Sequence, residues 1–407
     1  MGEILFLTHR VPWPPNRGDK IRSHHILRKL LAYKPVHLAC FADDLSEAQE
    51  DSAIKANLAS SHIALRTKSN WQAGIEALAT GKPVSLTSFE SEAIQGYVDQ
   101  ILQSRPIDCI FVFSGQMAQF VPASYSGRLV MDFADVDSAK FESYAESGKG
   151  PMAWINRREG KLLSAFEKQI GERADHSLFV SEAEASLFRQ RSGLDEQKIC
   201  AVGNGIDLEF YDPDAIAAVS HDCSGPKIIF TGQMDYRPNV EAVVSFSKQA
   251  MPTIVARFPD AEFIIVGRAP TPEVMRLDGE NGTRVAGSVD DIRAWIKSAD
   301  IVVAPLRIAR GIQNKVLEAM AMRKAVVASH PAAQGINALD KKHFYVAENV
   351  DHEAQLVCEL LAHPAKAGAL GDRASALIRS GYSWEQQLAN IATLCGIDAP
   401  EMAEAAE

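Results

Sequence analysis

Residues 304–321 read APLRIARGIQNKVLEAMA, and this stretch contains the transition from a buried strand to an amphipathic helix. The apolar run 301–304 predicts a strand that ends where the stretch begins. A polar loop follows, in which Gly311 permits a tight turn, and a helix is expected from Gln313 to Met322. A strand followed at once by a helix is the building unit of a parallel α/β sheet.

The loop and the helix start concentrate groups that bind phosphate. A helix N-terminus offers free backbone N–H groups and the positive end of the helix dipole. Arg307, Arg310 and Lys315 add cations, so the pattern favours a diphosphate ligand. Glu318 lies one turn beyond Lys315 on the same helix face, where its carboxylate could bind a pair of ligand hydroxyls. The alternative is an exposed helix start in which these charges pair only with one another.

Short apolar runs alternate with helical patterns along the whole chain. In the N-terminal half, strands are expected at 4–7, 36–41, 108–113, 128–133 and 178–180. After a loop-like stretch at 204–225 the pattern restarts, with strands expected at 227–231, 262–266, 285–286, 301–304 and 325–328. This rhythm predicts an α/β protein with two doubly wound domains, at 1–205 and 206–380. Ligands bind beyond the carboxyl ends of such strands, so a cleft between the two sheets is the expected site.

Composition narrows the class of protein further. The formal net charge of -10 disfavours a nucleic-acid partner across the whole surface. The six cysteines show no CxxC or other metal-binding spacing, so we expect buried thiols in a reducing compartment and no metal site. No run approaches about 18 uncharged apolar residues, and the apolar run at 4–7 is too short for a signal peptide. We therefore expect a cytoplasmic protein, with or without peripheral attachment to the inner membrane.

The stretch 304–321, together with the strand after it, resembles the donor-binding segment of GT-B glycosyltransferases, especially the family-four-like group 1 sugar transferases. Further segments carry the same resemblance: VGNGID at 202–207, IIFTG at 228–232 and FPDAEFIIVG at 258–267. The resemblance implies a GT-B fold, in which two Rossmann-like domains face a central cleft. The N-terminal domain would bind the acceptor and the C-terminal domain a nucleotide-diphosphate sugar, with no cofactor and no metal strictly required.

The resemblance also assigns residues to the donor site. Glu318 would bind the ribose of the donor, while Lys315 and Arg307 would hold its diphosphate. The full set that we expect to contact the donor is Lys315, Glu318, Arg307, Arg310, Gly311, Asn314, Arg237, Gly232, Asn204 and Gly205. The family pattern further implies a helix at 381–398 that crosses back to the N-terminal domain, followed by a frayed acidic tail at 399–407.

The chain departs from the family pattern in two respects. Many members have two glutamates separated by seven residues, and the first would fall on Arg310. Many also have an arginine and a lysine in the loop after the first donor-domain strand, where this chain has Gln233 and Pro238. Arg237 lies one position away and is expected to substitute. The variant loop GQMDYRPN at 232–239 resembles a subgroup of bacterial exopolysaccharide sugar transferases, including those that accompany the PEP-CTERM/exosortase system.

The segment THRVPWPPNRGDK at 8–20 follows the first expected strand. In GT-B enzymes a glycine loop at this place lies over the cleft, so Arg17, Gly18 and Lys20 are expected to approach the acceptor and the donor phosphate. Ser114, at the end of another strand, is expected beside them. Residues 1–40 contain seven basic and two acidic residues, which favours an anionic membrane surface or a polyprenyl-diphosphate acceptor. A solvated charged face is the alternative.

Three aspartates lie at or just after the end of the strand expected at 128–133, namely Asp132, Asp135 and Asp137. No histidine or cysteine lies at a spacing that would support a metal. We expect one aspartate, preferably Asp135 or Asp137, to be a catalytic base or a ligand of the acceptor hydroxyl. Turn and capping hydrogen bonds are the alternative role. Retaining family members have a histidine near the reacting sugar in this region, and this chain has none there.

The sequence therefore predicts a glycosyltransferase of the hexosyltransferase type. It would move a sugar, with retention, from a nucleotide-diphosphate sugar to a hydroxyl of a lipid-linked exopolysaccharide or cell-surface glycan intermediate. Its partners would be the nucleotide sugar, a polyprenyl-diphosphate-linked acceptor and the inner face of the cytoplasmic membrane, and no nucleic acid. Two alternatives stay open: a nucleotide-sugar epimerase of the same fold, and a catalytically silent nucleotide-sugar-binding scaffold in a polysaccharide assembly complex.

Overall fold

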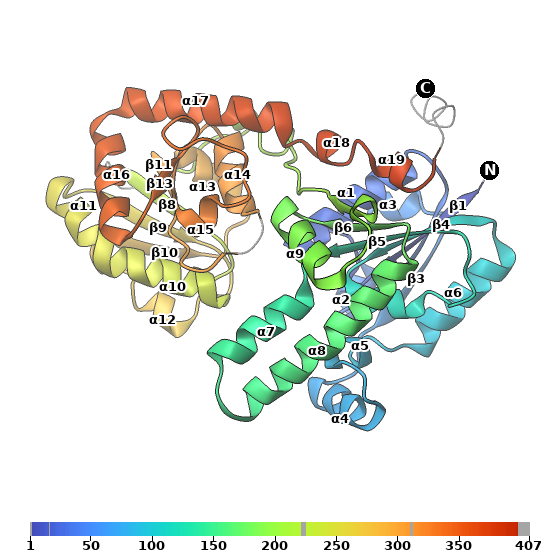
Figure 1. The fold of residues 1–407 in the computed structure, drawn as a ribbon. Helices are drawn as coiled ribbons and strands as arrows, with labels where there is room; N and C mark the ends of the chain where they lie inside the picture. The colour runs from blue at the N-terminus through green and yellow to red at the C-terminus, as the bar shows by residue number, and fades with distance from the viewer. Residues whose placement is uncertain (1, 16, 221–224, 310–311, 398–407) are drawn as a thin grey trace. The chain divides into compact units, whose positions relative to one another are not determined.

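The structure is a computed structural model that describes residues 2–15, 17–220, 225–309 and 312–397 (Figure 1). The chain forms two compact units. The first comprises the chain up to Gly203 together with the segment that begins at Leu388, and the second is Asn204–Gln387. The segment 381–387, expected in a crossing helix, therefore belongs to the second unit. Arg310, Gly311 and the tail at 399–407 lie outside the described residues.

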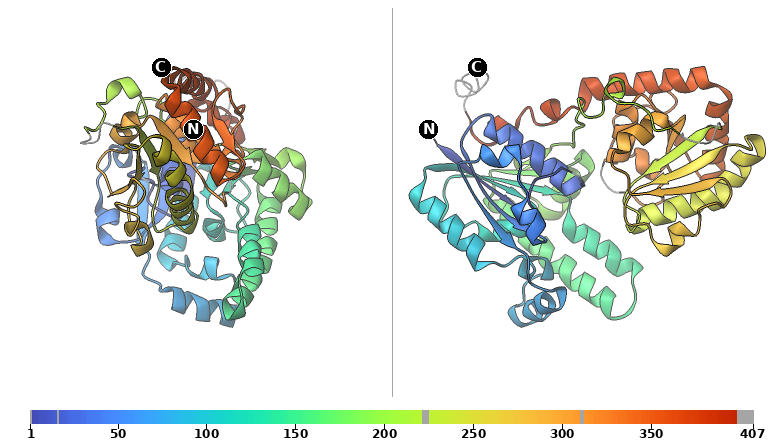
Figure 2. Two further views of the ribbon diagram at one scale, coloured as in Figure 1. Left: turned by 90° about the vertical axis from the view of Figure 1, so that its left-hand side faces the viewer. Right: turned by 180° about the vertical axis from the view of Figure 1, so that it is seen from behind.

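A seven-stranded sheet organises the first unit (Figure 2). Its strands are short apolar runs that the fold buries, and all of them pair in parallel. In chain order they are β1 Glu3–Thr8, β2 Val36–Ala42, β3 Ser60–Leu65, β4 Ile107–Phe113, β5 Arg128–Ala134, β6 His176–Phe179 and β7 Ile199–Ala201. The order across the sheet is β3-β2-β1-β4-β5-β6-β7. The chain order thus reverses between β1 and β4, where doubly wound sheets bind ligands beyond the strand ends.

Helices fill the connections between these strands, as parallel pairing requires. They are α1 Gly18–Leu31, α2 Leu45–Gln49, α3 Ala53–Ala56, α4 Asn70–Thr80, α5 Val84–Thr87, α6 Glu92–Ser104, α7 Asp137–Ser147, α8 Gly150–Arg173, α9 Glu182–Ser192 and, after the second unit, α19 Ile391–Leu394. Short 3-10 turns η1 Gly115–Phe120 and η2 Glu196–Lys198 complete the unit. The core lies on the sheet, where β1, β4 and β5 pack against α6, η1 and α9.

The second unit repeats the plan with a six-stranded parallel sheet. Its strands are β8 Lys227–Thr231, β9 Glu262–Val266, β10 Thr283–Gly287, β11 Ile301–Ala304, β12 Ala325–Ser329 and β13 Tyr345–Ala347. Its helices are η3 Pro213–Ala215, α10 Arg237–Ser245, a π segment η4 Phe246–Ala250, α11 Met251–Arg257, α12 Pro272–Met275, α13 Ile292–Ser298, α14 Asn314–Ala321, α15 His330–Ala333, α16 Val350–Ala362, α17 Pro364–Gly381 and α18 Trp384–Gln387. The sheet order β10-β9-β8-β11-β12-β13 reverses between β8 and β11.

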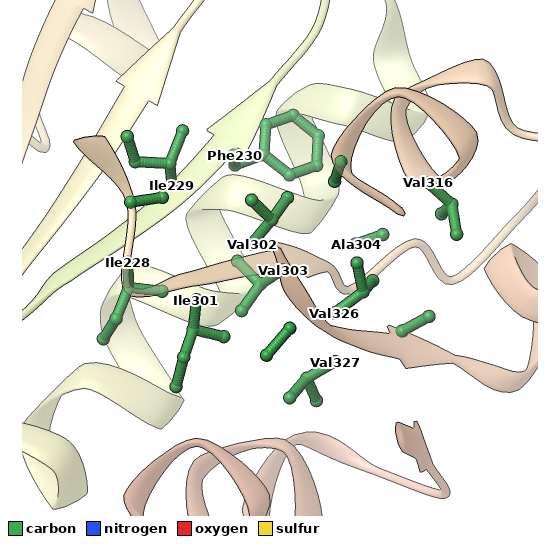
Figure 3. Close-up of a cluster of buried hydrophobic side chains, with 14 of the residues drawn as sticks. Ile228, Ile229, Phe230, Ile301, Val302, Val303, Ala304, Val316, Val326 and Val327 are labelled. Carbon is green, nitrogen blue, oxygen red and sulfur yellow. The ribbon is translucent and has the colours of Figure 1, made fainter. Parts of the chain in front are cut away.

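The core of the second unit explains how α14 is held. Aliphatic residues of β8, β11 and β12 form a continuous buried cluster, and Val316 of α14 packs at its margin (Figure 3). Val316, Leu317 and Met320 point inward because they recur at helical spacing. Lys315 and Glu318 therefore occupy the other side of the same helix.

The helix expected at 381–398 is instead two short helices, α18 and α19. Leu388, Ile391 and Ile397 are buried all the same, and the segment from Leu388 belongs to the first unit. Within the described ranges no helix is long and apolar enough to cross a membrane, and no cluster of acidic, histidine or cysteine side chains could hold a metal ion.

Candidate functional site

The second unit gathers polar groups where its strand order reverses. Gly232 follows the end of β8, and the loop from Pro305 follows the end of β11 and leads into α14. Because β8 and β11 are neighbours in the sheet, these two segments emerge at the same edge. This is the position at which an open α/β sheet places its ligand.

Close packing at this edge requires glycine. A methyl group on Gly232 would lie 3.0 Å from the Lys315 Nζ atom and 2.8 Å from the side-chain Nδ2 atom of Asn239. A methyl group on Gly267, at the end of β9, would lie 1.6 Å from the carbonyl oxygen of Gly232. Glycine at both positions therefore lets the loop after β8 settle against β9 and brings its backbone beside Lys315.

Lys315 is held by a polar chain from the loop after β8. Its Nζ donates a 2.6 Å hydrogen bond to Asn239 Oδ1, and Asn239 Nδ2 donates a 2.8 Å bond to the carbonyl oxygen of Gln233. The Nζ atom also lies 4.2 Å from the centroid of the Phe230 ring. Burial lowers the pKa of Lys315 to about 7, against an opposing contribution from Glu318. The alternative interpretation was an exposed helix start whose charges pair only with one another. The partly buried hydrogen bond of Lys315 to Asn239 differs from it.

Glu318 contacts a residue that the sequence did not indicate. Tyr211, from the loop after Asp207, donates a hydrogen bond to its carboxylate, while burial raises the pKa of Glu318 and the charge of Lys315 lowers it. Burial, followed by the negative charge of Glu318, raises the pKa of Tyr211 well above its usual value. Tyr211 thus remains a donor at neutral pH and fixes one side of the carboxylate. A carboxylate accepts several hydrogen bonds, so it can also accept from ligand hydroxyls.

Arg307, a predicted phosphate ligand, lies beside a buried acid. Its guanidinium nitrogen is 3.7 Å from Glu353 Oε2, and Glu353, in the first turn of α16, is 1% exposed. Neither carboxylate oxygen accepts a hydrogen bond in the described part of the structure. Burial raises the pKa of Glu353 to about 7, and Arg307 opposes this rise. No motif signals Glu353, because it is distant in sequence from the loop that it supports.

Two buried oxygen atoms at the same edge have no hydrogen-bond partner among the described residues. Thr231 Oγ1, at the end of β8, and Asn314 Oδ1, at the start of α14, make no hydrogen bond to any described residue. Unsatisfied buried polar atoms are uncommon in folded proteins, and a bound ligand is one way to satisfy them. Asn314 was predicted for this edge and Thr231 was not.

The remaining predicted donor residues have other surroundings. Arg237 is largely exposed and pairs with Glu241 one turn along α10, at 2.7 Å. Gly205 lies against Trp384, whose backbone a methyl group would approach to 2.6 Å. Asn204 precedes it at the start of the second unit. These contacts explain Gly205 by packing and leave Lys315, Glu318, Gly232 and Asn314 as the group that the structure brings together.

The aspartates of the first unit divide into two kinds. Asp132 is fully buried, and its carboxylate accepts a 2.8 Å bond from Arg22 Nε and a 3.0 Å bond from the Ala134 amide. It thereby ties β5 to α1. Asp135 is exposed in the loop before α7, and Asp137 begins that helix. Burial raises the pKa of Asp137, and Lys140 at 3.9 Å opposes this rise.

Backbone strain marks the ends of two central strands. Ser114, after β4, has φ 79° and Ala134, at the end of β5, has φ 65°. Such conformations cost about 1–3 kcal/mol for residues with a side chain and cluster at functional sites. The strained turn directs Ser114 Oγ to Gln116 Oε1 at 2.8 Å.

A charged network forms the start of α1. Asp19 accepts a 3.3 Å hydrogen bond from His9 and forms ion pairs with Arg10 and Arg17, each at 3.0 Å. Although burial opposes it, these partners lower the pKa of Asp19 far below its usual value. Lys20 is buried, donates to the Trp13 carbonyl oxygen and pairs with Glu47. Gly18 has open space around it. His9 was not predicted, and it places an imidazole after β1.

Comparison with known proteins decides the fold. Residues 225–363 match the family model described as "Glycosyl transferases group 1", and residues 143–210 match "Glycosyltransferase Family 4". The sucrose-phosphate synthase of Thermosynechococcus elongatus is similar in structure across 100% of both chains, with a TM-score of 0.71 and 15% identity. The fold is GT-B. The Anabaena protein HepE, solved with UDP and glucose, is also similar, with a TM-score of 0.65 and 14% identity over 97% of this chain and all of HepE.

Sequence similarity to a characterised relative is confined to part of the GT-B chain. A phosphatidyl-myo-inositol mannosyltransferase of Mycolicibacterium smegmatis is 34% identical over 175 residues. The aligned part covers 42% of this chain and 42% of the relative. The matched part therefore spans less than half of the length of this relative.

Proposed function

We propose that this protein is a glycosyltransferase that uses a nucleotide-diphosphate sugar as donor. The observation that carries the proposal is that Lys315 and Glu318 lie one turn apart at the start of α14, where β8 and β11 diverge. A cation held beside a glycine turn suits a diphosphate, and an adjacent carboxylate suits a ribose diol. The match of residues 225–363 to group 1 glycosyltransferases supports the same role.

The chemistry follows from the charges at this edge. In the transfer, the bond between the sugar C1 and the diphosphate oxygen breaks, and a bond from C1 to the acceptor oxygen forms. Lys315 and the N-terminus of α14 would stabilise the departing diphosphate by electrostatic preorganisation. Arg307, already close to Glu353, would add a second cation. With retention, the proton of the acceptor hydroxyl would pass to a leaving phosphate oxygen, and no protein base would be needed.

The first unit would supply the acceptor side. Under inversion Asp137 would be the base, because its raised pKa brings proton uptake closer to neutral pH. Asp135 is the second candidate, whereas the Arg22 pair gives Asp132 a structural role. We propose a lipid-linked acceptor at the inner face of the cytoplasmic membrane. The mannosyltransferase relative, named for phosphatidyl-myo-inositol, supports a lipid; the loop at 232–239 supports a bacterial exopolysaccharide intermediate.

A thermal-shift screen against UDP, GDP, ADP, TDP and CMP tests the donor site. At ligand a hundredfold above Kd, linkage predicts about 2.7 kcal/mol of stabilisation. We expect one nucleoside diphosphate to stabilise the parent and Glu318→Ala to lose this response, because the ribose diol loses its acceptor. Glu280→Ala, which alters an exposed glutamate of the same unit, should respond like the parent. Equal responses of parent and Glu318→Ala would overturn the ribose assignment.

Turnover separates the proposal from its alternatives. With a lipid-linked acceptor, sugar transfer is expected, whereas an epimerase would interconvert two nucleotide sugars without any acceptor. Binding of a nucleotide with neither reaction would favour the scaffold, for which the absence of the family's acidic residue at Arg310 is the motivating observation.

A further inference from the structure

Helix α4 presents an apolar face to solvent. Trp71 is 76% exposed, and Ile75 and Leu78 are also exposed. These positions are four and three residues apart, so they form one stripe of the helix. Ala73 and Ala77 lie on its other side and are fully buried. The helix therefore packs on the first unit through small residues and turns its large apolar residues outward.

The start of α8 has the same character. Met152, Trp154 and Ile155 are exposed, with Trp154 at 55%, and Tyr144 of the preceding α7 is exposed as well. Ala153, between them, is buried and anchors this turn. Exposed tryptophan and aliphatic residues gathered in one place are uncommon on a monomeric surface and mark interaction sites.

Hydrogen bonds join these two elements into one surface. Arg158 of α8 donates to the carbonyl oxygens of Ala77 at 2.6 Å and Lys82 at 3.1 Å. Glu159 accepts from the amides of Val84 and Ser85, at 2.8 and 2.7 Å. Both views of the first unit place α4 and the turn between α7 and α8 at the same end (Figures 1 and 2). We call the exposed residues of 71–78 and 152–155 the α4–α8 surface.

Positive charge borders the α8 part of this surface. Lys149, Arg157 and Lys161 are exposed, and none of them forms a recorded ion pair with another described residue. Of the nearby acids, Glu159 is buried against the α5 amides, whereas Glu146, at the end of α7, is exposed. The chain as a whole has a net charge of -10, so this cationic rim runs against the overall charge. Apolar residues with tryptophan inside a basic rim are the pattern of segments that lie in a membrane interface.

Helix α1, where the sequence predicted the membrane contact, has fewer exposed groups that could bind a membrane than the α4–α8 surface. Its Arg22 is buried on Asp132 and its Lys20 is buried beside Glu47. Lys34, just after the helix, pairs with Asp108 at 3.3 Å. Among the described residues of α1 no large apolar side chain is exposed. Arg28 stays exposed without apolar neighbours to insert.

We propose that the α4–α8 surface docks on an anionic lipid bilayer. Trp71, Leu78 and Trp154 would enter the interface, while Arg157 and Lys161 would contact anionic headgroups. The inference rests on the proposed function in one respect: a lipid-linked acceptor, which lies at a membrane, explains why the protein would bind a bilayer. The docking itself is measured without any sugar transfer, so each of the two proposals can fail alone.

Vesicle flotation of the full chain tests the proposal. We expect the parent to float with vesicles of phosphatidylglycerol and phosphatidylcholine and much less with phosphatidylcholine alone. Trp71→Ser/Leu78→Ser and Arg157→Glu/Lys161→Glu should each lower the apparent vesicle affinity by about tenfold or more, because they remove apolar insertion and cationic attraction respectively. Circular dichroism and the nucleotide-induced thermal shift should stay as in the parent.

Two matched controls complete the design. Met275→Ser/Leu339→Ser alters exposed apolar residues of the second unit, and Arg28→Glu/Lys29→Glu alters α1; both should float like the parent. If only the α1 variant fails to float, the membrane contact lies on α1 and the proposal is overturned. A parent that does not float, but whose self-association Trp71→Ser/Leu78→Ser abolishes, would mean that a second copy covers the surface and would overturn the proposal equally.

Discussion

Proton binding by Lys315 should couple donor affinity to pH. Burial brings the pKa of this ammonium group to about 7, and a diphosphate prefers the charged form. We therefore expect the affinity for the nucleotide sugar that binds to fall as pH rises from 6 to 8.5, by up to about tenfold. A nucleotide sugar is the right probe, because its esterified diphosphate does not titrate in this range. Isothermal titration calorimetry across the range measures the effect.

Substitution of Lys315 should remove this pH dependence. Lys315→Met should bind weakly at every pH, whereas Lys342→Met, an exposed lysine of the same unit, should follow the parent. The effect on folding has a definite sign. The pKa is lower in the folded state, so the unfolded chain binds more protons between about pH 7 and 10.5, and the parent gains stability as pH rises through this window. A parent with a flat affinity profile would refute the assignment of Lys315.

Single residues show how much of the candidate site the sequence could indicate. Lys315 and Glu318 could be predicted, because a strand, a basic loop and a helix start lie within one continuous segment. Tyr211, Asn239 and Glu353 could not, because they reach the site only through the order of the strands in the folded sheet. Sequence also could not tell which aspartate of the cluster is structural. The partner of Asp132 is Arg22, which is 110 residues away along the chain.

At the scale of elements, strongly apolar segments were predicted well. The strands at 227–231, 262–266 and 301–304 were expected with the bounds that the structure has. β3 was missed because it is only partly buried and lies at the sheet edge. β7 and β13 were missed because each contains three residues, too few for a recognisable pattern.

Substitution of two glycines of α17 should change the free energy of unfolding in opposite directions. Gly368 has open space around it, whereas a methyl group on Gly371 would lie 2.2 Å from the carbonyl oxygen of Arg323, just after α14. Gly368→Ala should raise the free energy of unfolding by about 0.5–1 kcal/mol through helix propensity. Gly371→Ala should lower it by about 1–3 kcal/mol, because α17 must move away from the segment after α14. Urea unfolding measures both, and equal effects of the two would contradict this packing.

At the scale of the whole molecule, the chain passes between its two units twice, after Gly203 and after Gln387. Near these two crossings, the beginning and the end of the second unit contact each other. The Ile206 amide donates a 2.7 Å bond to the Tyr382 carbonyl oxygen, and Ile206 and Ser383 form a parallel bridge. Its hydrophobic core begins at Ile206 and includes Tyr382. The second unit is thus one continuous segment with a core of its own.

This continuity predicts that residues 204–387 fold alone. The fragment should unfold cooperatively and bind the nucleotide within about threefold of the affinity of the full chain, since every donor group that the structure brings together lies inside it. A fragment that stops at 380, where the sequence placed the domain boundary, lacks Tyr382, whose hydroxyl accepts from the Asn337 amide at 2.6 Å. Loss of this buried aromatic residue should cost about 3 kcal/mol. Urea unfolding and calorimetry compare the fragments. Equal stability of the two fragments would contradict the stabilising role of Tyr382. Loss of nucleotide binding by 204–387 would mean that the donor site depends on more of the chain.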